Sequence, residues 1–104
     1  MSKEIKLSSH MKFAHARYRK DGGDNSAEAF REDVLLPALK KNSTVTLDMT
    51  SDFGFPMSFS EELFGGIIRR GDLSAEELLT QLNVVSDDPF ESDLIIRLIK
   101  RAKS

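Results

Sequence analysis

Apolar and polar residues alternate in several short segments, a pattern that is typical of β-strands. The clearest segment is residues 44–49, where every second residue from Val45 is apolar and turn formers stand on both sides. Residues 4–8 alternate in the same way and predict a short edge strand, and residues 84–85 predict another. Residues 12–18 fit either a strand or a short helix. The pattern therefore predicts about four strands.

Longer segments place apolar residues three and four positions apart, as one face of an α-helix does. The first covers about residues 26–41, and Asn25 followed by Glu28 is a start signal for it. Pro37 stands inside this segment and cannot donate a backbone hydrogen bond, so we expect a kink or an early end near Leu36.

A second helix is predicted from Ser58 to Gly71. The hydroxyl of Ser58 can cap the first turn, and Glu61 stands at the position that closes a capping box. Gly71 is a typical residue just beyond the end of a helix. Gly65 and Gly66 lie within this helix, where each costs about 1 kcal/mol relative to alanine. We expect this cost to be offset by close packing of the helix against the sheet.

Two further helices are predicted towards the carboxyl end. Ser74 and Glu77 form a capping box before a short helix. Asp88 and Pro89 open the final helix, which runs to Lys103. The apolar residues of the final helix are predicted to share one face, and basic residues follow near its end, where they suit the helix dipole. The members of that face are Phe90, Leu94, Ile95, Leu98, Ile99 and Ala102.

Strands and helices that interleave along a chain point to one sheet with helices packed on it. The chain has 104 residues, which is enough for one domain with one modest core. Its hydrophobic fraction of 39% and its charged fraction of 31% are ordinary for a globular protein. We therefore expect a single α/β domain over residues 1–104, in which three to four helices pack on a small mixed sheet of about four strands.

Charge and residue content narrow the classes of function. Fifteen basic residues against seventeen acidic ones give a net charge of -2, so nucleic-acid binding through the basic final helix is the least favoured alternative. No cysteine is present, which excludes a thiol nucleophile and suits a reducing cytoplasm. His10 and His15 would project from opposite faces of a strand, so no metal site is predicted. No segment has the apolar length of a signal peptide or membrane span. We expect a cytoplasmic protein without a cofactor.

Several short motifs occur along the chain in a distinctive order and spacing. They are Arg17-Tyr18, Asp21-Gly22, Ser26 with Phe30-Arg31, Leu35 to Leu39, and Ser58 to Gly66. Together these motifs resemble the STAS-like bacterial family of unassigned function, over roughly residues 13–96. The helix motif that begins at Ser58, shortly after the predicted strand 45–49, carries most of the resemblance.

The resemblance implies the fold of the anti-sigma-factor antagonists and of the cytosolic domains of sulphate transporters, a small mixed sheet flanked by helices. In those relatives a serine that opens the helix after a central strand is phosphorylated by a kinase-like partner, and this controls binding. Ser58 matches that serine, although Met57 stands where the relatives usually have aspartate and Phe59-Ser60 where they often have serine-glycine. The resemblance therefore implies a regulatory module with an ATPase or kinase-like partner and Ser58 as its candidate phosphorylation switch.

The loop and helix start at residues 53–62 form the leading candidate site for a protein partner. The apolar residues of this loop either pack in the core or form an exposed interaction patch. The candidate partner-binding residues are Phe53, Phe55, Met57, Ser58, Phe59 and Glu62. On this hypothesis the chain binds a partner and is not an enzyme, because no nucleophile or metal site accompanies its carboxylates.

The second hypothesis is a small nucleotide-binding or anion-binding domain or an enzyme, and it uses Arg17, Asp21 and Asp48. Its candidate anion-binding residues precede the glycine-rich turn and are Arg17, Arg19 and Lys20. No glycine motif of the kind that cradles a phosphate accompanies them. The sequence leaves the oligomeric state open.

Overall fold

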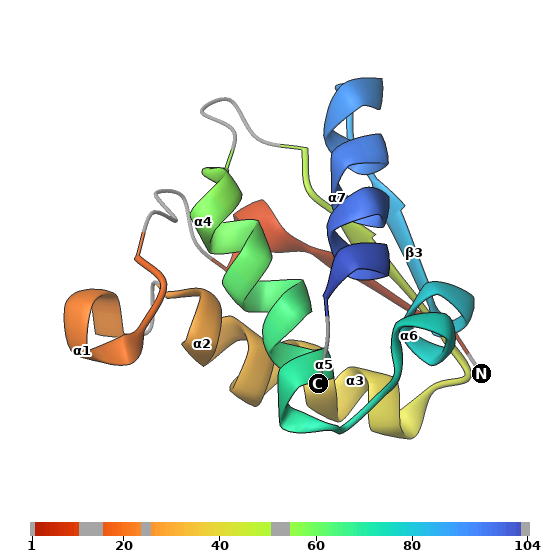
Figure 1. Ribbon diagram of the computed structural model, residues 1–104, viewed down its shortest axis with the longest axis horizontal. Helices are drawn as coiled ribbons and strands as arrows, with labels where there is room; N and C mark the ends of the chain where they lie inside the picture. Colours follow the sequence, from red (N-terminus) through yellow and green to blue (C-terminus); the bar gives the residue numbers. More distant parts are fainter. Residues whose placement is uncertain (1, 11–15, 24–25, 51–54, 103–104) are drawn as a thin grey trace.

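The computed structural model describes residues 2–10, 16–23, 26–50 and 55–102. It contains a three-stranded parallel sheet with the strand order β1-β2-β3 (Figure 1). The strands are β1 (Ser2–Lys6), β2 (Thr44–Asp48) and β3 (Leu82–Val85). The prediction of an α/β domain is therefore confirmed. The described strands are three and all parallel, whereas the sequence pattern predicts about four in a mixed sheet.

The alternation that predicts the central strand decides which face of the sheet is buried. Val45 and Leu47 of β2 are fully buried, and so is Met49 directly after the strand. Thr46, between them, points to the opposite face and is only half-buried. The helices pack on the apolar face of the sheet (Figure 1). The strand residues on the opposite face are mostly polar. The fold is thus a two-layer arrangement of helices on one sheet.

The segment 12–18 does not supply a fourth strand in the described residues. Residues 11–15, which include His15, lie outside them. Ala16 forms an isolated parallel bridge with Ser26. The chain then continues into the short helix α1 (Arg19–Gly22).

The predicted helix over residues 26–41 is present and runs as three consecutive parts. These are α2 (Ala27–Phe30), the π-helical turn η3 (Arg31–Leu35) and α3 (Leu36–Lys41). Ser26 caps it, because its hydroxyl oxygen accepts a hydrogen bond of 3.1 Å from the amide of Ala29. This corrects the start signal assigned to Asn25, which lies outside the described residues. Pro37 falls in the first turn of α3, directly after the π-helical turn.

The second long helix begins one residue earlier than predicted and has a different cap. It comprises α4 (Met57–Ser60), the π-helical turn η4 (Glu61–Gly65) and α5 (Gly66–Arg70). Pro56 occupies the cap position, and no side chain makes a capping hydrogen bond there. The predicted capping box of Ser58 and Glu61 is therefore wrong. Gly71 ends the helix as predicted, with a φ of 81° in the left-handed region that favours glycine.

The two carboxyl-terminal helices and their amino-terminal caps are confirmed, although the last helix ends at Arg101 and the predicted end, Lys103, lies outside the described residues. In α6 (Ala75–Gln81), Ser74 and Glu77 form the predicted capping box. In α7 (Pro89–Arg101), the Asp88 carboxylate accepts a hydrogen bond of 3.0 Å from the amide of Phe90. Throughout the described ranges, every helix is too short or too polar to cross a lipid bilayer.

The hydrophobic core lies between the sheet and the helices. Its largest fully buried side chains come mainly from the strands, from both long helices, from α6 and from α7. They include Phe30, Leu35, Leu47, Phe59, Phe64, Ile67, Leu78, Ile95 and Ile99. Burial of this apolar surface is the main favourable contribution to folding. It also fixes α4, η4 and α5 beside α7, which sets up the groove described next.

Candidate functional site

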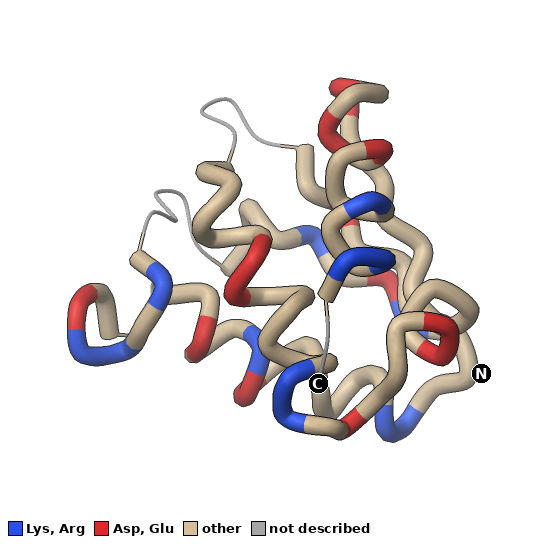
Figure 2. Tube along the Cα trace, viewed as in Figure 1, with Lys and Arg blue, Asp and Glu red and all other residues tan. Residues whose placement is uncertain are grey.

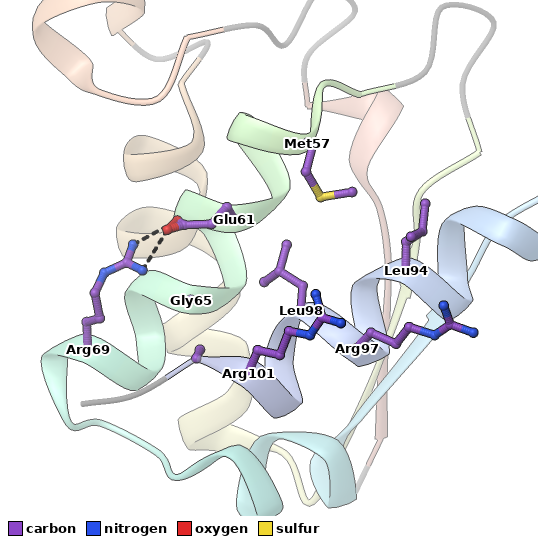
Figure 3. Close-up of a pocket in the computed structure, with 9 residues that line it drawn as sticks. Met57, Glu61, Gly65, Arg69, Leu94, Arg97, Leu98 and Arg101 are labelled. Atoms are coloured by element: carbon purple, nitrogen blue, oxygen red, sulfur yellow. Dashed lines mark hydrogen bonds and ion pairs between the residues drawn. The ribbon is translucent and has the colours of Figure 1, made fainter.

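A groove of about 620 Å³ lies between the helix of residues 57–70 and α7, and we name it the α4–α7 groove (Figure 3). Its first wall consists of Met57, Glu61, Gly65 and Arg69, which follow one another at intervals of one helical turn. Gly65 has no side chain, so the middle of this wall is formed by helix backbone. The groove is therefore open along its centre.

The second wall of the α4–α7 groove is the exposed side of α7. Leu94 and Leu98 give this wall its apolar part, and Arg97 and Arg101 give it positive charge. Figure 3 shows Met57 and Leu98 pointing into the space between the two helices. The groove thus combines an apolar interior with a cationic rim.

Exposed apolar groups concentrate at one end of the groove. Met57 is 50% exposed and Leu94 is 45% exposed, although both are large apolar side chains. Leu98 is half-buried and packs against the core. An apolar surface of this kind marks a place where another molecule can bind.

A buried ion pair supports the first wall from behind. The Arg31 guanidinium donates to the Glu62 carboxylate at 2.7 Å and to the Glu62 carbonyl oxygen at 2.8 Å. Only 7% of the Arg31 side chain and 9% of the Glu62 side chain are exposed. Burial acts to lower the pKa of Arg31, but hydrogen bonds to Glu32 and Glu62 outweigh it and the pKa is raised. Arg31 therefore stays charged and links two helices that are distant in sequence.

Gly66 makes room for this arginine. A Cβ atom at residue 66 would lie 1.9 Å from Nη1 of Arg31 and 2.8 Å from its Cζ. The expectation that Gly65 and Gly66 allow close packing against the sheet is therefore wrong. Gly66 faces the buried guanidinium on the neighbouring helix, and Gly65 lines the groove.

Glu61 joins the groove wall to the neighbouring amino-terminal segment. Its carboxylate accepts hydrogen bonds of 2.8 and 3.1 Å from Arg69, the interaction marked in Figure 3. It also accepts one of 3.0 Å from Arg17. These pairs are partly exposed, so each contributes little to stability, but together they hold Arg69 in position along the wall.

The candidate partner-binding residues divide into exposed and buried ones. Met57 and Ser58 are exposed at the start of the helix, and Phe55 is half-buried and stacked on Phe59 with ring centroids 5.5 Å apart. Phe59 is fully buried, and Glu62 is held by Arg31. This placement removes Phe59 and Glu62 from the candidate surface. Phe53 lies outside the described residues.

The candidate anion-binding residues have partners within the chain. Arg17 is paired with Glu61, and Arg19 donates to Asp33 at 2.6 Å. The Lys20 ammonium lies 5.7 Å from the centroid of the Tyr18 ring. An anion would have to compete with the carboxylates for both arginines.

Arg17, Asp21 and Asp48, the residues of the second hypothesis, each have a different environment in the structure. Asp21 is exposed on α1, and Asp48 lies at the end of β2, where it accepts a hydrogen bond of 2.9 Å from the amide of Thr50. The backbone and hydroxyl hydrogen bonds from Thr50 lower the pKa of Asp48, and the charge of Lys6 adds to this. Among the interactions of the described residues, none connects any two of the three.

The α7 side of the groove is the part that sequence reasoning missed. The pattern places Phe90 and Leu94 on one apolar face of the final helix together with Ile95 and Ile99, but Phe90 is 77% exposed. Of that face, Ile95 and Ile99 are fully buried. The signal was the width of the apolar stripe, which is broader than the side that a helix packed on a sheet can bury.

Comparison with known proteins places the chain in a family. No curated protein and no solved structure matches it significantly. Residues 26–89 match the family model described as STAS-like domain of unknown function (DUF4325), which covers more than half of the chain. The match contains the helix with Ser26 at its cap, β2, the helix of residues 57–70 and β3. The chain therefore belongs to the STAS-like domain family.

Proposed function

We propose that this STAS-like domain is a protein-interaction module that acts by binding and not by catalysis, and that its interface is the α4–α7 groove. The observation that carries the proposal is the exposure of Met57 and Leu94 at the groove between two helices. Burial of large apolar side chains by a partner lowers the free energy of the complex. Met57 also adapts readily to the shape of a partner, because its side chain is unbranched.

The charges of the groove favour one kind of partner surface. Arg97 and Arg101 lie beside the apolar residues, and Arg69 stands on the opposite wall. A partner that presents an apolar side chain flanked by carboxylates would satisfy both features. The resemblance of the chain to anti-sigma-factor antagonists supports an ATPase or kinase-like protein as this partner. A chain without cysteine suits such an activity in the cytoplasm.

Ser58 is the proposed regulatory residue of this interface. It is exposed, it follows Met57 directly, and it lies in the first turn of the helix. A phosphate there would add about 1.5 to 2 negative charges near free backbone amides, which a helix start tolerates. The helix would remain intact while the charge at the interface changes. A partner rich in carboxylates would then bind more weakly.

The interface is tested by site-specific photo-crosslinking in the cells that make the protein. A photoreactive amino acid replaces Met57 in one variant and the exposed residue Lys40, at the end of α3, in a matched control. We expect a covalent adduct with another protein from position 57 and none from position 40. Adding Leu94→Glu to the position 57 variant should remove the adduct.

Two results of this experiment would contradict the proposed interface. The first is equal adduct formation from both positions, and the second is an adduct from position 57 that Leu94→Glu leaves unchanged. Regulation at Ser58 is tested with the same variant. Ser58→Asp should lower the adduct yield and Ser58→Ala should preserve it, whereas equal yields would exclude control by charge at this residue.

A further inference from the structure

The α4–α7 groove has the size and the lining of a small-molecule site. Its volume of about 620 Å³ lies within the range of about 300 to 1,000 Å³ that ligand pockets in proteins span. Leu94 and Leu98 line one wall, and Met57 lies on the other (Figure 3). At Gly65 this other wall is helix backbone, which leaves room for a ligand between the two helices. The groove can therefore take an elongated apolar body.

Most charges around the groove are already paired within the chain. Eight side chains form one connected network of ion pairs, in which four arginines balance four carboxylates. Its members are Arg17, Arg31, Arg69, Arg70, Glu32, Glu61, Glu62 and Asp72. Glu61 and Arg69, the two charged residues of the first wall, both belong to it. The first wall is therefore part of a network without net charge.

The second wall differs, because it carries an arginine without a partner. Arg97 pairs with Asp93 at 3.1 Å. Arg101 makes no ion pair or side-chain hydrogen bond with the residues that the structure describes. Figure 2 shows basic residues towards the carboxyl end of α7. Lys100 adjoins Arg101 there, so the two charges exceed the partial negative charge of about one half at this helix end. The groove thus has an unbalanced positive charge at Arg101.

We infer that the α4–α7 groove binds a small organic acid with one carboxylate and an apolar body. Leu94, Leu98 and Arg101 follow one another along one side of α7, at spacings of four and three residues. The carboxylate binds the Arg101 guanidinium. The apolar body lies against Leu98, Leu94 and Met57. One carboxylate matches the one unpaired arginine, and the planar guanidinium can donate two parallel hydrogen bonds to it.

The same features disfavour other classes of ligand. A phosphate monoester would bring a second negative charge, which no further unpaired arginine among the described lining residues balances. A cationic amphiphile would be repelled by Arg101. An acid without an apolar body would leave Leu94 and Leu98 exposed to water. The groove therefore selects an amphipathic monocarboxylate.

This ligand site overlaps the proposed interface with a protein partner, because both use Leu94, Leu98 and Met57. The acid and the partner would compete for these side chains, so the acid would regulate binding of the partner. Binding of the acid itself requires no second protein. Its test is therefore independent of the proposed interface, which can hold or fail separately.

NMR spectra of the methyl groups of the purified chain, recorded at about pH 7 with up to about 10 mM of a probe acid, test the site. The probes are octanoate, which has a linear chain, and naphthoate, which has a ring system. At least one of them should shift the signals of Met57, Leu94 and Leu98 in a saturable manner, whereas acetate and octyltrimethylammonium should not. No saturable shift with either acid, or an equal response to octyltrimethylammonium, would overturn the inference.

Two substitutions that remove the same charge separate the site from a general effect of charge. Arg101→Gln should weaken binding of the acid about fivefold or more. Lys100→Gln should leave it unchanged within about twofold, because Lys100 is exposed on the same helix but does not line the groove. Equal effects of the two variants would show that Arg101 does not hold the carboxylate.

The apolar half of the site is tested at Leu94. Leu94→Ser should weaken binding of the acid several-fold, because it removes part of the surface that the apolar body covers. Circular dichroism checks that this variant and both charge variants are folded, as the exposure of all three residues predicts. Unchanged affinity in Leu94→Ser would contradict the placement of the ligand in the groove.

Discussion

The guanidinium of Arg31 fills the space that a side chain at Gly66 would need, since a Cβ there would lie 1.9 Å from Nη1. Arg31 cannot move aside without cost, because it is buried and hydrogen-bonded to both the carboxylate and the carbonyl of Glu62. The glycine, the arginine and the glutamate therefore form one unit. It joins the helix of residues 57–70, which forms one wall of the groove, to η3.

This unit predicts opposite effects for alanine at two adjacent glycines. Gly66→Ala should lower the free energy of unfolding by about 3 kcal/mol or more, because it displaces Arg31 from its buried partner. Gly65→Ala should raise it by up to about 1 kcal/mol, since a Cβ there would meet only the partly exposed side-chain ends of Arg69 and Glu61, and alanine favours the helix. Urea denaturation of both variants measures the difference. Equal effects of the two substitutions would show that Arg31 does not occupy this space.

The buried ion pair of Arg31 and Glu62 predicts that the effects of substituting its two members on stability are not additive. Arg31→Met and Glu62→Leu should each destabilise the domain by up to about 3 to 5 kcal/mol, because each removes the buried partner of a buried charge and leaves that charge with more exposed partners only, Glu32 for Arg31 and Arg17 and Arg69 for Glu62. The double variant should be considerably more stable than the sum of these losses implies, since no buried charge remains. Thermal or urea denaturation of the four proteins gives the coupling energy. Additive losses would contradict the pairing.

The two serines near helix starts should differ in their effect on stability. Ser26→Ala removes the capping hydrogen bond to Ala29 and should cost about 0.5 to 2 kcal/mol. Ser58→Ala removes no cap and should change stability by less than about 0.5 kcal/mol. Both are measured by urea denaturation. A loss at Ser58 as large as that at Ser26 would indicate that Ser58 does cap the helix.

Asp48 predicts a dependence of stability on pH. Its pKa is lowered in the folded protein by the hydrogen bonds from Thr50, so the folded state prefers the charged form. The stability that this provides is complete above the unfolded pKa of about 3.9 and is lost as the pH falls through the folded value. Wild type should therefore exceed Asp48→Asn in stability at about pH 6, and the difference should shrink below about pH 4. A difference that grows on acidification would contradict the direction of the shift.

The strands and most helix ends were predictable because they depend on local rules. The alternation of apolar and polar residues indicates which face of β2 is buried. Ser74 and Glu77 form a capping box within one turn of chain. Gly71 ends its helix because glycine readily adopts the left-handed conformation needed there. The cap at Ser58 failed because Pro56 already supplies the extended residue from which the helix starts. A serine with a glutamate three positions later can stand inside the first turn of a helix as well as at its cap. The spacing of Ser58 and Glu61 therefore does not by itself locate the cap.

The candidate site was only partly predictable because it depends on contacts between distant segments. Met57 and Ser58 were identified from the loop and the helix start, and both are exposed. Leu94 and Arg101 lie far from Met57 in the sequence, and only the packing of α7 brings them into the same groove. The burial of Arg31 against Gly66 likewise has no local signal, since arginine is usually exposed.

The central claim is tested most directly with the partner that the crosslink at position 57 identifies. Titration calorimetry measures the affinity of this purified partner for wild type and for Met57→Glu. Met57 is exposed, so this variant should stay folded. The groove interface predicts binding at least about tenfold weaker for Met57→Glu, about 1.4 kcal/mol, with no change for Lys40→Glu. Unchanged affinity in Met57→Glu would show that the partner binds elsewhere.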